Sequence, residues 1–119
     1  MTKKERQAYD RRWYAENKDR LRDSKNNRTR ETRIRNSRYV FEYLKNHPCI
    51  DCGENDPVVL EFDHRKDKTK NVSDLLRGSY SIERIKQEIE KCDVRCANCH
   101  RRKTAIQFGW YQHIIGNVV

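Results

Sequence analysis

The sequence is short of the residues that build a large core and of those that break helices. Hydrophobic residues make up 34% of the 119 positions and charged residues 38%, and the chain has four glycines and two prolines. So few apolar side chains bury too little surface for secure folding by hydrophobic packing alone. The composition therefore excludes a generous core and predicts one small domain, stapled by disulfides or a metal, with an appendage.

Long apolar runs are also missing. No stretch approaches the roughly 20 residues that cross a bilayer, and the opening MTKKER is too charged to begin a secretory signal. We therefore expect a cytoplasmic protein whose cysteines stay reduced. No membrane partner is expected, because binding to an anionic membrane surface needs a sustained apolar helix face, which the sequence lacks.

Acidic residues are outnumbered, 18 against 27 lysines and arginines, which gives a net charge of +9. Nearly all of the excess lies in residues 1–45, where fifteen basic residues accompany seven acidic ones. Such an imbalance favours a polyanionic partner.

The segment 1–46, called the arm below, is predicted to be a basic helical segment that binds DNA. It contains neither glycine nor proline, and it opens on T-x-x-E from Thr2, which is the spacing of a capping box. We expect a helix near 3–22, a weak point at 24–27 and a second helix near 29–45, whose far end docks on the domain. The alternative is a solvated and partly disordered arm.

Cysteine is rare, five in all, but two C-x-x-C pairs account for four of them. Together the pairs offer the four ligands of a closed structural zinc site: Cys49, Cys52, Cys96 and Cys99. A zinc ion held by four cysteines has no open position, so it should fold the domain and perform no catalysis. The alternatives are four unlinked buried cysteines or a redox disulfide. Cys92 lies outside the pairs and is expected to be a small buried residue.

Residues 47–109 are predicted to form a small α+β domain stapled by this zinc, with the tail 110–119 left unassigned. The expected elements, in order, are a strand over 58–62, a polar loop over 65–71, a helix over about 82–91 capped by Ser81, a strand at 93–95, and a helix from about 98 to 108 that Gly109 ends.

Asp63, His64 and His100 are the candidates for catalysis. Asp63 and His64 follow the expected strand directly, and His100 follows a cysteine of the second pair. If one zinc ties the two pairs together, Asp63 and His100 can meet on one Mg²⁺ or Mn²⁺ ion that keeps open positions. His64 points to the other face of the strand from Asp63 and is free to take a proton from water. A base beside a metal is what phosphodiester hydrolysis needs.

The order of these motifs resembles the zinc-containing HNH endonucleases, which are common in bacteriophages and mobile elements. The resemblance covers about residues 49–108 and is carried by C-I-D-C at 49–52, L-E-F-D-H-R at 60–65 and C-A-N-C-H-R-R-K-T at 96–104. It implies a ββα-metal fold in which His64 is the general base, and in which Asp63 and His100 hold the catalytic ion.

The resemblance also bears on DNA contacts. It implies that the basic residues after His100 face backbone phosphate. With the basic residues of the arm and of the loop, the expected DNA-binding set is Arg11, Arg12, Arg22, Arg65, Arg101, Arg102 and Lys103. One position departs from the family pattern, because Lys91 stands where an asparagine usually lies five residues before the third cysteine. In the family that asparagine mainly fixes the loop that orients the base.

We therefore expect a metal-dependent endonuclease that nicks or cleaves double-stranded DNA, with structural Zn²⁺ and catalytic Mg²⁺ or Mn²⁺. If a phage encodes it, it acts in the cytoplasm of the host cell. The main alternative is a non-catalytic zinc-ribbon module that binds nucleic acid, which explains the charge and the cysteines but gives no reason for the Asp63 and His64 pair. A third hypothesis is an auxiliary of phage packaging or recombination machinery, which nicks on its partner's schedule.

Overall fold

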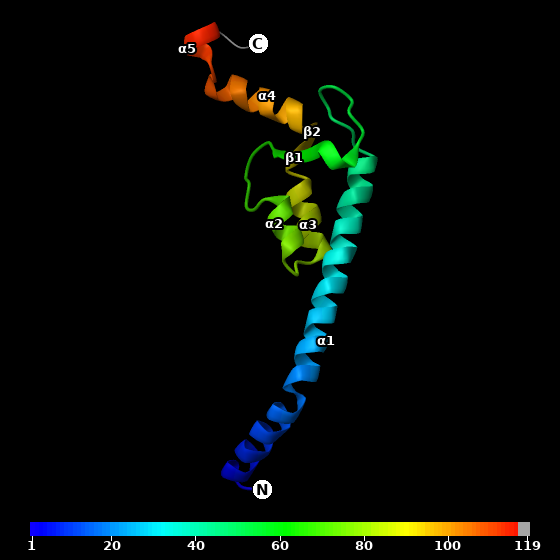
Figure 1. Cartoon of the computed structure of the whole chain (residues 1–119), viewed down its shortest axis with the longest axis vertical. Helices are drawn as coiled ribbons and strands as arrows, with labels where there is room; N and C mark the ends of the chain where they lie inside the picture. Colours follow the sequence, from blue (N-terminus) through cyan, green and yellow to red (C-terminus); the bar gives the residue numbers. More distant parts are fainter. Residues whose placement is uncertain (117–119) are drawn as a thin grey trace.

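The computed structural model describes residues 1–116 and shows one long helix whose C-terminal part packs against a small α+β domain (Figure 1). The elements, in order, are α1 (Lys3–Lys45), a 3₁₀ turn (Pro57–Val59), β1 (Leu60–His64), α2 (Val72–Arg77), α3 (Ile82–Ile89), β2 (Cys92–Cys96), α4 (Ala97–Phe108) and α5 (Gln112–Ile115). The predicted α+β class is confirmed. The last three residues of the predicted tail 110–119 lie outside the described residues.

Helix α1 is continuous, so the prediction of two helices with a weak point at 24–27 is wrong. Serine and asparagine there are poorer helix formers than alanine, but each costs at most about 0.7 kcal/mol, and no glycine or proline interrupts the run. The predicted capping box is confirmed: Thr2 Oγ1 accepts a hydrogen bond from Glu5 N at 3.2 Å, and Thr2 N donates to Glu5 Oε2 at 2.9 Å. The helix ends at Lys45, ahead of the His47–Pro48 pair.

Only the far end of α1 docks on the domain, as predicted. Its buried residues are Asn36, Val40 and Leu44, which share one face because they lie four residues apart. Asn36 is fully buried, and its Nδ2 donates to the backbone oxygen of Tyr80 at 2.9 Å, which satisfies the buried amide. The preceding part of α1 extends away from the domain, and the molecule is 79 Å long (Figure 1).

Strands β1 and β2 form an antiparallel pair in which Leu60 faces Cys96 and His64 faces Cys92. The predicted second strand is confirmed and extends one residue beyond 93–95 at each end. The first strand begins two residues later than predicted and includes Asp63 and His64, because Pro57–Val59 form a 3₁₀ turn before it.

Helix α4 contacts both strands, while α2 packs against α1 and α3. Helix α3 is capped by Ser81, as predicted, and ends at Ile89, while α4 starts one residue earlier than predicted and ends at Gly109 with φ 65°. Helix α2 was not predicted, although it supplies core residues. The core is small; its most buried apolar side chains are Leu75, Ile85 and Ile89. Within residues 1–116, no helix has both the length and the apolar character needed to cross a membrane.

Candidate metal centres

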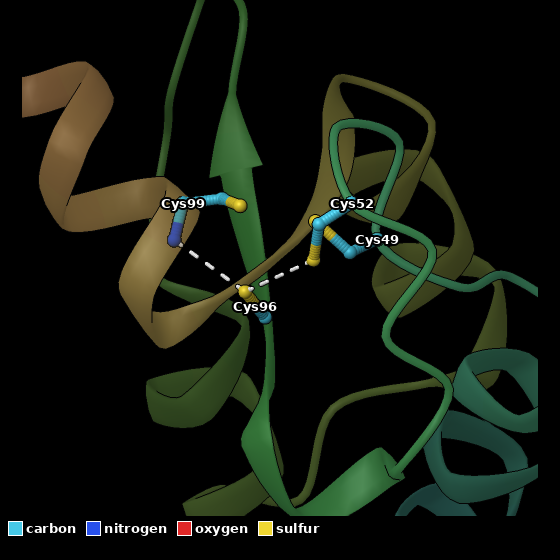
Figure 2. A group of neighbouring side chains, drawn as sticks. All are labelled: Cys49, Cys52, Cys96 and Cys99. Carbon is cyan, nitrogen blue, oxygen red and sulfur yellow. Dashed lines mark hydrogen bonds between the residues drawn. The ribbon is translucent and has the colours of Figure 1, made fainter.

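The four predicted zinc ligands converge from two separate parts of the chain. Cys49 and Cys52 lie in the turn between α1 and β1, while Cys96 ends β2 and Cys99 lies in the first turn of α4 (Figure 2). Their Sγ atoms all lie within 4.8 Å of one another, and those of Cys52 and Cys96 are 3.7 Å apart. Zn–S bonds of about 2.3 Å at tetrahedral angles separate sulfur atoms by about 3.8 Å. The four cysteines therefore form a possible zinc-binding site, as predicted.

Local backbone geometry builds each half of this cluster. Gly53 adopts φ 81°, and its amide donates to the Cys49 oxygen at 2.9 Å, which closes the first turn. Ile50 N donates to Val94 O at 3.0 Å and ties that turn to β2. Cys96 caps α4 by accepting a hydrogen bond from Cys99 N at 3.4 Å. The two pairs are thus placed by the sheet and by a helix start.

The close packing of the four thiols affects how readily each one ionises. Burial raises the pKa of Cys49, but the hydrogen bonds from the backbone at Cys96, Cys52 and Asp51 have the larger effect. The pKa of Cys49 is therefore lowered, to about 6. The hydrogen bond to Cys96, together with burial, raises the pKa of Cys99 to about 12. Four thiolates this close repel one another, so full ionisation needs a positive ion among them. A bound zinc ion would supply that charge.

Cys92 lies outside the cluster, as predicted. It is buried, its Sγ donates to the backbone oxygen of Glu88 at 3.3 Å, and burial raises its pKa to about 11. A protonated, buried thiol of this kind packs as a small apolar residue.

Asp63 and His100 meet beside the cysteine cluster. Asp63 projects from β1, and His100 lies in the first turn of α4, directly after Cys99. His100 Nε2 is 3.5 Å from Asp63 Oδ1, and His100 Nδ1 is 2.8 Å from Glu61 Oε2. Glu61 is two residues before Asp63 on the strand, so strand alternation puts both carboxylates on one face.

The chemistry of this pair suits a cation. When the neutral His100 ring donates from Nδ1 to Glu61, its Nε2 carries a lone pair that faces a carboxylate oxygen of Asp63. Two acceptors so placed repel unless a proton or a metal ion lies between them. Ligand atoms about 2.1 Å from one ion, at bond angles of 90–110°, lie about 3.0–3.4 Å apart. A carboxylate that orients a ligating histidine from its other nitrogen is a common support for metal sites.

The second oxygen of Asp63 is already paired. Asp63 Oδ2 accepts from Arg95 Nη1 at 2.7 Å and from Lys103 Nζ at 2.8 Å. Burial raises the pKa of Asp63, but the hydrogen bonds from Lys103 and Arg95 and the charge of Lys103 oppose burial, and the pKa is lowered overall, so the carboxyl is ionised at neutral pH. These contacts fix the carboxylate and leave Oδ1 directed at His100.

His64 occupies the opposite face of β1 from Asp63, as predicted. Its Nε2 is 2.9 Å from Glu88 Oε1, and its side chain is 11% exposed. Asp63 and His64 nevertheless both line one surface cavity of about 610 Å³, together with Arg65, Arg102 and Lys103. The predicted base and the predicted metal ligand therefore open onto the same space.

The expected DNA-binding residues differ in what they contact. Arg65, Arg102 and Lys103 all line the cavity. The Arg65 guanidinium is also held by Asp93 Oδ1 at 3.0 Å and by the Glu90 backbone oxygen. The other four are exposed. Arg101 Cζ lies 5.1 Å from the centroid of the Trp110 ring, and Arg22 Nη2 is 3.3 Å from Asp19 Oδ1. Arg11 and Arg12 lie along α1 with their side chains exposed to solvent.

Several residues of the site were not predicted. Glu61 had a usable signal, since it stands two residues before Asp63 in a strand. Arg95 and Glu88 had none, because their roles depend on the strand register and on the packing of α3 against β1. Lys91 departs from the family pattern in the sequence, but its contacts to Asp67 and Thr69 depend on the fold.

Protein-family models, curated proteins and solved structures were all compared with the chain, and none matches it.

Proposed function

We propose that this protein is a metal-dependent endonuclease of the HNH type that hydrolyses phosphodiester bonds in double-stranded DNA. The observation that carries the proposal is the meeting of Asp63 and His100 across 3.5 Å, with His64 on the cavity that Asp63 also lines. A zinc ribbon that only binds nucleic acid has no need of this arrangement.

The residues divide the work of hydrolysis. Asp63 and His100 would hold Mg²⁺ or Mn²⁺, which when bound stabilises the negative charge that develops on the phosphate and the leaving oxygen. His64 takes a proton from water, whose oxygen bonds to phosphorus as the bond from phosphorus to the 3′ oxygen breaks. The 3′ oxygen takes a proton from solvent, which leaves a 3′-hydroxyl and a 5′-phosphate. The charges of Arg102 and Lys103 suit a backbone phosphate in the cavity.

Wild-type protein purified with zinc is expected to nick supercoiled plasmid only when Mg²⁺ or Mn²⁺ is added, and to leave 5′-phosphate ends. The measurement is gel conversion of supercoiled to open-circular plasmid, with end-labelling of the products. The control omits the added ion and uses no chelator, because a chelator would also remove the structural zinc. Protein that binds the plasmid but shows no metal-dependent nicking would contradict the proposal.

The arm supplies most of the charge for DNA binding in this proposal. No residue of α1 before Asn36 is buried, so the basic side chains there are free to reach phosphates. Arg11 and Arg22 are eleven residues apart, close to three helical turns, so they point the same way, while Arg12 points about 100° from them.

Replacing Arg11, Arg12 and Arg22 together by glutamine is expected to weaken DNA binding and to flatten its salt dependence. Each lost phosphate contact lowers the slope of log K against log salt by about 0.9, so the loss is about 2–3. Fluorescence anisotropy with duplex DNA across a salt series measures the slope. The matched triple lysine variant keeps the charge and should keep the slope. An unchanged slope in the glutamine variant would show that these three residues of the arm do not contact DNA phosphates.

A non-catalytic zinc-ribbon module remains the second candidate, and one observation favours it. Within residues 1–116, the four cysteines are the one group of three or more ligating side chains placed closely enough to hold a metal ion, and Asp63 is already paired with Arg95 and Lys103. Metal stoichiometry separates the two functions. One tight zinc with no weak Mn²⁺ site, by atomic absorption and by electron paramagnetic resonance of free Mn²⁺, favours the binding module.

A further inference from the structure

Glu88 is a charged residue in the interior of the domain. It lies in α3 beside Ile85 and Ile89, and all three side chains are at most 2% exposed. A carboxylate in such a place is strongly destabilising unless donors surround it. The position therefore calls for an explanation beyond packing.

Five donors surround the Glu88 carboxylate, and His64 is one of them. Oε1 lies 2.9 Å from His64 Nε2 and accepts from Thr69 N at 3.0 Å and Lys70 N at 3.3 Å. Oε2 accepts from Arg84 Nη1 at 3.0 Å and Lys91 Nζ at 3.1 Å. Burial raises the pKa of Glu88, but the hydrogen bonds from Thr69, Arg84, Lys91 and Lys70 lower it well below its ordinary value, so the carboxyl is ionised.

The ionised carboxylate dictates which nitrogen of the His64 ring carries the proton. An ionised carboxylate only accepts hydrogen bonds, so Nε2 must donate. In the neutral ring, Nδ1 then holds the lone pair. Among the described residues 1–116, every buried polar side-chain atom has a hydrogen-bond partner. The ring bonds to protein through Nε2 and not through Nδ1. Nδ1 is therefore not buried and reaches solvent.

Glu88 and Lys91 together hold the loop that follows His64. Besides Thr69 and Lys70, which Glu88 binds directly, Lys91 Nζ donates to Asp67 O at 3.1 Å and to Thr69 Oγ1 at 3.0 Å. Arg65 N donates to the Lys91 oxygen at 2.9 Å. Glu88 and Lys91 thus hold the loop 65–71, the task that the HNH resemblance gives to an asparagine at position 91.

We propose that Glu88 is the positioning residue for His64: it holds the ring in one orientation and in the Nε2–H form, so that Nδ1 is the atom that takes the proton from water. This role rests on the nuclease function proposed above. Glu88 itself touches neither the DNA nor the reacting atoms.

The test reads the ring directly, without DNA or a catalytic ion. Proton–nitrogen correlation spectra of ¹⁵N-histidine protein loaded with zinc should show His64 as the Nε2–H form in the wild type. Glu88→Gln should lose that single form, because an amide can donate as well as accept. Arg84→Gln is the matched control, since it removes another partner of Glu88 and leaves the contact to His64 intact. It should keep the Nε2–H form.

Nicking kinetics supply the second readout. Glu88→Gln is expected to lower kcat by about 10²-fold, while KM for plasmid and the anisotropy Kd for duplex DNA stay within about twofold. A merely structural role would change KM and Kd as well, or would change both variants alike. If Glu88→Gln fails to fold, the wild-type spectrum still tests the proposal, because the proposal requires His64 in the Nε2–H form.

The outcomes separate the two proposals. A wild-type His64 in the Nδ1–H form, or a Glu88→Gln variant with unchanged ring and unchanged kcat, overturns the role of Glu88. A wild-type protein in the Nε2–H form that never nicks DNA supports the hold of Glu88 on the ring and overturns the nuclease function instead.

Discussion

Replacing His64 by alanine is expected to lower the rate of metal-dependent plasmid nicking by about 10²–10⁴-fold, which is the usual contribution of a positioned general base. DNA binding should change little, because the His64 side chain is only 11% exposed and is not among the residues expected to contact phosphate. The measurement compares initial nicking rates at saturating Mg²⁺ or Mn²⁺ with the Kd from anisotropy. A variant that keeps more than a tenth of the wild-type rate would remove His64 from the chemistry.

Variants of two other histidines test whether the loss of nicking is specific to the role of His64. His113 lies exposed in α5, away from the site, and His113→Ala should nick at the wild-type rate. His100→Ala should also lose activity, but by a different route, since His100 is the proposed metal ligand. More divalent ion should recover part of the activity of His100→Ala and none of that of His64→Ala. The same recovery in both variants would mean that the two roles are wrongly divided.

The site could be predicted from the sequence where its logic is local. Strand alternation places Asp63 and His64 on opposite faces, and C-x-x-C spacing brings together the two thiols of each pair in a possible zinc site. Both expectations agree with the positions found, including the approach of His100 to Asp63. A helix start after Cys96 is also a local feature, and it carries His100 with it.

What the sequence did not indicate depends on tertiary packing. Glu88 reads in the sequence as one more polar residue on an amphipathic helix, and only the packing of α3 against β1 turns it inward to His64. Arg95 reaches Asp63 because the antiparallel register sets Glu61 opposite Arg95. The prediction of a weak point in α1 was wrong for another reason. Weak helix formers lower the stability of a helix gradually, whereas only glycine or proline reliably interrupts a helix.

Loss of the cysteine cluster is expected to unfold the α+β domain. Cys49, Cys96 and Cys99 are themselves part of the small core, and structural zinc contributes about 10–16 kcal/mol in small zinc-dependent folds. That is comparable to the whole stability of an ordinary small domain, about 5–15 kcal/mol. Cys52→Ser, or removal of zinc by a chelator, should therefore collapse the amide dispersion in NMR spectra and abolish the cooperative thermal transition.

Cys92→Ser is the matched control for this prediction, because Cys92 is equally a cysteine and is buried but lies outside the cluster. It should bind one equivalent of zinc and keep the cooperative transition, with a loss of at most about 1–3 kcal/mol for a polar atom placed in the core. Zinc content by atomic absorption and melting by circular dichroism distinguish the two variants. Protein that keeps its native spectrum after complete zinc removal would show that the core stands without the metal. The alignment of Asp63 with His100 would then have to come from β1, β2 and α4 alone.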